Sequence, residues 1–97
     1  MHIKILDDAQ EDILLSTLFY ESQQDGIGNY FLDTISSDIE SLHLYAGIHP
    51  SKFGYYYFLS KRFPYTIYYQ IEEDIIKIFA VFDDRRDPKL IENRLKG

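Results

Sequence analysis

Three strand-forming runs follow one another in the second half of this 97-residue chain, with only a few residues between them. They are rich in Tyr, Phe and Ile, which pack well on a pleated sheet. The runs are Tyr55–Ser60, Tyr65–Ile71 and Ile75–Phe82. Parallel neighbours need a crossover of about a dozen residues or more, and both connections here are far shorter. The sequence therefore predicts three consecutive antiparallel strands.

The first half of the chain predicts a short strand followed by two helices. Residues His2–Leu6 alternate apolar and polar side chains, as a strand does. Residues 9–23 predict a helix with an apolar stripe and two flanking leucines, namely Ala9, Ile13, Thr17 and Tyr20 with Leu14 and Leu18. A second helix begins near Asn29, and its apolar positions are Phe31, Ile35, Ile39 and Leu42. The link between the helices is short, so we expect an antiparallel hairpin.

Residues that favour helix ends mark the boundaries of the helices. Asp7 and Asp8 offer carboxylate oxygens that are expected to cap the start of the first helix. Gly26 accepts the left-handed conformation that commonly ends a helix. Asp87 and Pro88 are expected to begin a short C-terminal helix, because Pro suits the first helical turn.

The predicted elements combine into an α+β fold with the order β-α-α-β-β-β-α. The helix hairpin packs on a small, mainly antiparallel sheet, and residues 45–53 are expected to be irregular. A chain of this length supports one core but not two, so we expect a single domain over residues 1–97.

The last strand is apolar on both of its faces. One expected face carries Ile76, Ile78, Ala80 and Phe82, and the other carries Ile75, Lys77, Phe79 and Val81. In an antiparallel sheet with one solvent-exposed face, apolar and polar residues alternate along each strand. This strand lacks that alternation, so both of its faces are expected to be covered. The helix hairpin covers one face. The other is left either to the C-terminal helix or to another chain.

Composition excludes several kinds of site. The chain has no Cys, which rules out disulfides, thiolate metal sites and thiol nucleophiles. His43 and His49 lack the spacing of paired zinc ligands and are expected on the surface. We therefore expect no metal and no cofactor. The N-terminal residues are too short for a secretion signal, and no window approaches the roughly 20 apolar residues of a membrane span. The expectation is a soluble cytoplasmic protein without a membrane partner.

Charge is unevenly divided along the chain. Residues 1–44 carry nine acidic side chains and one basic one, a net charge of −8. Residues 45–97 carry nine basic and seven acidic side chains, a net charge of +2. The total of −6 argues against tight, non-specific binding to nucleic acid. A local basic patch in the second half remains open.

Two sequence blocks resemble the RelE/ParE superfamily, the toxins of bacterial type II toxin–antitoxin pairs. They are KRFPYTIYY at residues 61–69 and VFDDRRDP at residues 81–88. The resemblance runs from Asp12 to Pro88. It implies a compact toxin with a microbial-ribonuclease-like fold that a segment of its antitoxin wraps, in a toxin–antitoxin hetero-oligomer. Such pairs are associated with plasmid stabilisation.

The two branches of the superfamily imply different activities. RelE-like members cleave mRNA on the ribosome with basic strand residues, and Arg85 or Arg86 lies where the last-strand arginine lies. The strand after Gly54 has no cation, however, and Asp83-Asp84 stands where many relatives carry His-Gly. ParE-like members inhibit DNA gyrase by protein contact. We favour the ParE-like branch and assign no catalytic residue; a RelE-like endoribonuclease and a degenerate toxin that binds only its antitoxin are the alternatives.

Six residues are candidates for contact with the target or the antitoxin: Lys61, Arg62, Arg85, Arg86, Phe79 and Tyr56. The four basic residues stand at strand ends, and antiparallel pairing is expected to bring them to nearby edges. Arginine binds carboxylate or phosphate with two hydrogen bonds, which suits an acidic antitoxin tail. The alternative is that the arginines form salt bridges within their loop, to Asp83, Asp84 and Asp87.

Overall fold

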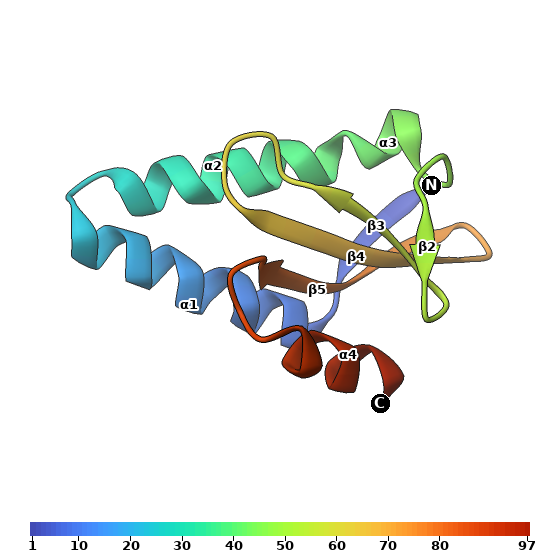
Figure 1. Cartoon of the computed structure of the whole chain (residues 1–97). Coiled ribbons are helices and arrows are strands. Elements are labelled where there is room, and N and C mark those ends of the chain that lie inside the picture. Colours follow the sequence, from blue (N-terminus) through green and yellow to red (C-terminus); the bar gives the residue numbers. More distant parts are fainter.

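A helix hairpin lies across one face of a five-stranded sheet in the computed structural model, which describes all residues from Met1 to Gly97 (Figure 1). The elements are β1 (His2–Ile5), α1 (Asp7–Gln23), α2 (Ile27–Glu40), α3 (Leu42–Tyr45), β2 (Ser51–Lys52), β3 (Tyr55–Leu59), β4 (Tyr65–Glu72), β5 (Ile75–Asp83) and α4 (Pro88–Lys96). The α+β class is confirmed. Two short elements, α3 and β2, add to the predicted order near the stretch that was expected to be irregular. None of the helices is both long enough and apolar enough to cross a membrane.

The sheet has the strand order β1-β5-β4-β3-β2. The strands β3, β4 and β5 are consecutive antiparallel neighbours, as their short connections predicted. The chain reaches β5 only after the helix hairpin and the other strands, and β1 pairs with it in parallel, from His2 beside Ile75 to Ile5 beside Ile78. The first strand of the chain is therefore one edge of the sheet.

A β-bulge in β5 corrects the predicted faces of that strand. Tyr69 lies opposite Ile78 and Tyr68 opposite Ala80, so Phe79 is an extra residue in the register. An extra residue reverses the alternation beyond it. Ile76 and Ile78 consequently share the helix-side core with Val81 rather than with Ala80 and Phe82, which belong to the opposite face.

The main core lies between the hairpin and the sheet. The predicted buried stripe of α2 is confirmed, because Phe31, Ile35, Ile39 and Leu42 are all buried. From α1 only Ala9 and Ile13 are buried. Leu14 and Leu18, which were expected beside the buried stripe, are 53% and 57% exposed.

The ends of the first two helices differ from the sequence prediction. Asp7 and Asp8 do not cap α1, because β1 runs directly into the helix and Leu6 takes the capping position in an extended conformation. The two carboxylates stand instead in the first turn, where negative charge suits the positive end of the helix dipole. The helix α2 begins at Ile27, earlier than expected, and Gly26 precedes it in the left-handed conformation.

The opposite face of the sheet carries a second, smaller core that α4 covers. Tyr68, Ala80, Phe82 and Leu95 are buried there. The helix begins as predicted, with Pro88 in the first turn and the Asp87 carboxylate accepting from the Lys89 N–H at 2.9 Å. The C-terminal helix thus covers this part of the face, through Leu95 and Ile91.

Candidate partner-binding surface

The helix α1 is apolar on faces that the core does not use. Leu14 and Leu18 form one exposed stripe, and Leu15 and Phe19 form a second, with exposed fractions between 52% and 57%. Residues four apart lie above one another on a helix, so each pair makes a continuous strip. A helix with apolar side chains on all sides is usually buried on all sides. In this chain only part of α1 is buried.

The first stripe borders a groove of about 720 Å³ between the two helices and the sheet edge. The helix α1 contributes Ile13, Leu14 and Thr17, α2 contributes Leu32, Ser36 and Ile39, and β1 contributes Ile3 and Ile5. Figure 1 shows β1 beside the open end of the hairpin, away from the link that joins the helices. Six of the eleven residues that line the groove are apolar, and Lys4, Asp7 and Gln10 are among the polar ones.

The strand β1 exposes backbone hydrogen-bonding groups at the groove. The His2 N–H donates to the Asp74 carbonyl at 2.9 Å, and the Leu6 N–H donates to the Ile78 carbonyl at 3.0 Å. Successive residues of a strand point their N–H and C=O groups to opposite sides. The N–H groups of Ile3 and Ile5 therefore point away from β5, toward the open side. The Ile5 carbonyl on that side accepts from the Gln10 Nε2 at 2.8 Å. An edge of this kind is a template for a strand from another chain.

The second stripe borders a smaller cleft of about 230 Å³ at the end of β5. Leu15, Phe19, Tyr65 and Arg86 line it together with polar residues. Burial raises the pKa of Tyr65 to about 12, so its phenol stays protonated at neutral pH. The Arg86 guanidinium lies over the Phe82 ring, 5.8 Å from its centroid, and forms no salt bridge to the neighbouring acids. Arg86 is thus an exposed cation beside an apolar stripe, close enough to help lower the pKa of Asp83 without a direct salt bridge.

The two basic pairs predicted to lie on nearby edges are at the same end of the sheet. Lys61 and Arg62 lie between β3 and β4, and Arg85 and Arg86 follow β5. The two connections touch, since the Asp84 N–H donates to the Pro64 carbonyl at 2.7 Å. The pairs face different helices, because Arg62 donates to the Tyr30 hydroxyl of α2 and Arg85 donates to the Tyr20 hydroxyl of α1.

Arg85 is held within its own loop. Its Nε and Nη2 donate to the two carboxylate oxygens of Asp83 at 2.9 and 2.7 Å. The Arg85 guanidinium lowers the pKa of Asp83. The other two acids of the loop have separate partners, Thr66 for Asp84 and the start of α4 for Asp87. For Arg85, the salt bridge within the loop is therefore the observed arrangement.

Phe79 and Tyr56 lie on opposite faces of the sheet. Tyr56 stacks on Tyr69 with the ring centroids 5.1 Å apart and packs against the main core. Phe79 stacks on Tyr55 at 4.4 Å and packs against the core under α4. The two aromatic candidates therefore do not contribute to one surface.

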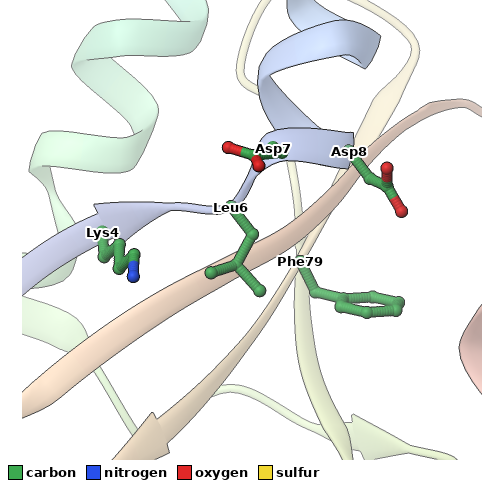
Figure 2. Close-up of a pocket in the computed structure, with 5 residues that line it drawn as sticks. All are labelled: Lys4, Leu6, Asp7, Asp8 and Phe79. Atoms are coloured by element: carbon green, nitrogen blue, oxygen red, sulfur yellow. The ribbon is translucent and has the colours of Figure 1, made fainter.

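Phe79 also lines a pocket of about 310 Å³ where β1 enters α1. Figure 2 shows its ring pointing away from Lys4, and the carboxylates of Asp7 and Asp8 pointing in different directions. Divergent carboxylates do not form the convergent oxygen shell that a hard cation requires.

The two histidines that were expected on the surface, His43 and His49, have different surroundings. His43 is exposed and pairs with Glu40 at 3.3 Å. His49, expected on the surface, is partly buried: its ring stacks on Phe58 at 4.6 Å and its Nδ1 lies 2.6 Å from the Tyr69 hydroxyl. The Tyr69 hydroxyl also accepts from the Gly47 N–H, so the three residues fix the loop before β2.

A partly buried ion pair that the sequence did not predict joins three elements. Arg94 of α4 donates through Nη1 and Nη2 to the two carboxylate oxygens of Asp12 on α1, both at 2.9 Å. One of these oxygens also accepts from the Val81 N–H of β5 at 3.0 Å. The only signal in the sequence is that Arg94 lies on the same side of α4 as Ile91 and Leu95, where an apolar residue is expected.

Comparison with known proteins finds likeness in structure, and no match to a family model or a curated protein. A chain of the structure described as "Chromosomal ParDE TA system from P. aeruginosa" has a TM-score of 0.78 and 17% sequence identity, over 86% of this chain and 95% of that one. The chain therefore has the ParE-like fold that the sequence resemblance implied.

Proposed function

We propose that this chain is the toxin of a bacterial type II toxin–antitoxin pair, and that the groove between α1, α2 and β1 binds a segment of its antitoxin. The fold shared with the ParDE structure supports the class of protein. The observation that carries the binding site is the groove of about 720 Å³ with the half-exposed Leu14 at its border and the free edge of β1 at its end. The protein acts in the bacterial cytoplasm.

An antitoxin segment suits the groove better than a small molecule does. The groove lies between two helices and the edge strand β1, and half-exposed Leu14 lies at its border. An extended segment buries such a long surface, and a segment that folds on binding typically buries 1,000 Å² or more. The backbone groups of Ile3 and Ile5 add hydrogen bonds that an apolar small molecule lacks.

For the cellular target we propose the ParE-type mode, in which the toxin binds a protein such as DNA gyrase and hydrolyses no RNA. Arg86 is the basic candidate best placed for this contact, because it forms no ion pair within its loop and lies beside Leu15 and Phe19. Lys61 and Arg62 extend the same end of the sheet. The protonated phenol of Tyr65 makes a poor general base there.

Antitoxin binding is tested with the protein encoded by the neighbouring gene. Both proteins are expressed together, with a tag on the antitoxin, and the toxin that co-purifies is measured. Leu14→Glu and Leu32→Glu place a charge in the groove and are expected to abolish co-purification. Leu44→Glu is the matched control, because Leu44 is 80% exposed on α3, outside the groove. Retention of the complex by both groove variants contradicts the site.

The target is tested by induced expression without the antitoxin. Induction of the DNA-damage response, with intact mRNA, is the expected result of gyrase inhibition. Codon-phased cuts on programmed ribosomes support the RelE-like alternative instead. A chain that binds its antitoxin but never inhibits growth is the degenerate toxin.

A further inference from the structure

The cleft beside the second stripe of α1 contains two acidic residues, and both are already paired. Asp12 and Asp83 line this cleft of about 230 Å³ at the end of β5. Each Asp12 oxygen accepts from Arg94 at 2.9 Å, and one of them also accepts from the Val81 N–H at 3.0 Å. The two Asp83 oxygens accept from the Arg85 side chain at 2.9 and 2.7 Å. Each acid is therefore neutralised by an arginine of its own.

Arg86 is the cation among the residues that line the cleft, and its charge has no partner of this kind. It is exposed, and it takes part in none of the salt bridges of the chain. Its guanidinium lies over the uncharged Phe82 ring. Because the two acids and their arginines cancel, the cleft keeps one positive charge. The complementary group is an anion.

The wall of the cleft beside Arg86 is apolar. Leu15 and Phe19 line it from one side of α1, and each is more than half exposed. Ser16 and Tyr65 add two side chains that carry hydroxyl groups. A ligand that matches this arrangement therefore carries its negative charge next to a bulky apolar group.

The acidic surroundings of the cleft favour a single carboxylate over a polyanion. Residues 1–44 have a net charge of −8, and α1 itself exposes Asp7, Asp8 and Glu11 before it reaches the cleft. A nucleic acid, with a charge at every phosphate, is repelled by these acids. An aspartate or glutamate side chain brings one charge to the one unpaired arginine.

We propose that this cleft binds an aspartate or glutamate side chain of a protein partner, and that a bulky apolar side chain next to it in the partner packs on Leu15 and Phe19. Arg86 donates two parallel hydrogen bonds to the carboxylate, as arginine commonly does. The inference rests on the target contact proposed above and adds the chemistry of the segment that is bound. Leu14 and Leu32 line the antitoxin groove, which is a separate surface.

The probe for this site is the capped pentapeptide acetyl-Leu-Phe-Glu-Leu-Leu-amide, titrated into the isotope-labelled wild-type protein. Its counterpart replaces Glu by Gln, which has nearly the same shape but no charge. The glutamate peptide is expected to shift the backbone amide signals of Leu15, Phe19 and Arg86 saturably. The glutamine peptide is expected to bind about tenfold more weakly, because it loses the charge-assisted hydrogen bonds.

Two variants locate the charge. Arg86→Gln is expected to remove the preference for the glutamate peptide. Lys89→Gln removes one positive charge from an exposed position in the first turn of α4, outside the cleft, and is expected to leave the preference intact. Equal affinity of the wild-type protein for the two peptides overturns the proposal. The absence of a saturable shift overturns it too, as does tighter binding of a short RNA at the same residues.

Failure of this inference is distinguishable from failure of the proposed function. The titration uses purified protein, whereas growth inhibition and the DNA-damage response are measured in cells. Gyrase-type inhibition by a chain without the glutamate preference overturns the inference alone. A glutamate preference in a chain that induces no DNA-damage response supports the chemistry of the cleft and overturns the gyrase-type mode.

Discussion

Removal of Arg94 is expected to be one of the most destabilising single changes outside the apolar core. The substitution Arg94→Met keeps much of the stem but deletes both hydrogen bonds to Asp12. The Asp12 side chain, 11% exposed, is then left with the Val81 N–H as its donor. Loss of one partner of a buried ion pair costs about 3–5 kcal/mol. Because the Arg94 side chain is 24% exposed, we expect the lower end, about 3 kcal/mol.

Urea denaturation followed by circular dichroism measures this loss. A small protein loses about 1–3 kcal/mol of stability per molar urea, so the midpoint should fall by about 2 M. The control is Lys96→Met on the same helix, because Lys96 pairs with Glu92 at 2.6 Å but both side chains are about half exposed. An exposed pair contributes less than about 1 kcal/mol.

A double-mutant cycle separates the pair from general damage to α4. Asp12→Asn keeps an acceptor for the Val81 N–H and removes the charge. The double variant with Arg94→Met should be more stable than the two single losses predict, by about 2 kcal/mol. If Arg94→Met costs no more than Lys96→Met, the ion pair does not hold α1, β5 and α4 together.

Three further predictions follow from individual contacts. Gly28→Ala should lower the urea midpoint, because a Cβ there would lie 2.8 Å from the Thr17 carbonyl oxygen and from Glu21; an unchanged midpoint contradicts this packing. Burial lowers the pKa of His49, so the folded state resists its protonation and stability should fall as the pH drops below the ordinary value of 6.5; in urea titrations at several pH values His49→Gln should flatten this dependence, and an unchanged dependence contradicts the assignment. Arg86→Ala should reduce growth inhibition without changing the melting temperature, and an equal loss of toxicity and stability would make Arg86 structural.

The strand arrangement was predictable because it depends on connection lengths. The connections on either side of β4 admit only antiparallel neighbours, whatever the side chains do. The buried stripe of α2 was predictable because polar residues separate its apolar positions. The predicted ends of the four expected strands agree with the observed ends of β1, β3, β4 and β5 to within one residue.

The face of β5 could not be read from the sequence, since both faces are apolar and the bulge at Phe79 leaves no compositional trace. The same holds for α1, where leucines surround the helix and do not indicate which side is buried. The buried faces of β5 and of α1 are decided by how these elements pack against the rest of the fold.

The polar contacts were beyond sequence reasoning because their partners are distant along the chain. Asp12 and Arg94 are 82 residues apart in the sequence, and Asp38 and Ser60 are 22 residues apart. The salt bridge between Arg85 and Asp83 joins residues only two apart in the sequence. It was therefore predictable, as the alternative in which the arginines pair with acids of their own loop.

Amide hydrogen exchange of the chain, alone and in complex with the protein encoded by the neighbouring gene, tests the central proposal most directly. The account predicts that binding slows exchange at Ile3 and Ile5, whose N–H groups face the open edge of β1, and along the parts of α1 and α2 that line the groove. It predicts little change in α4. A stable complex that leaves Ile3, Ile5 and the groove unprotected would contradict the account.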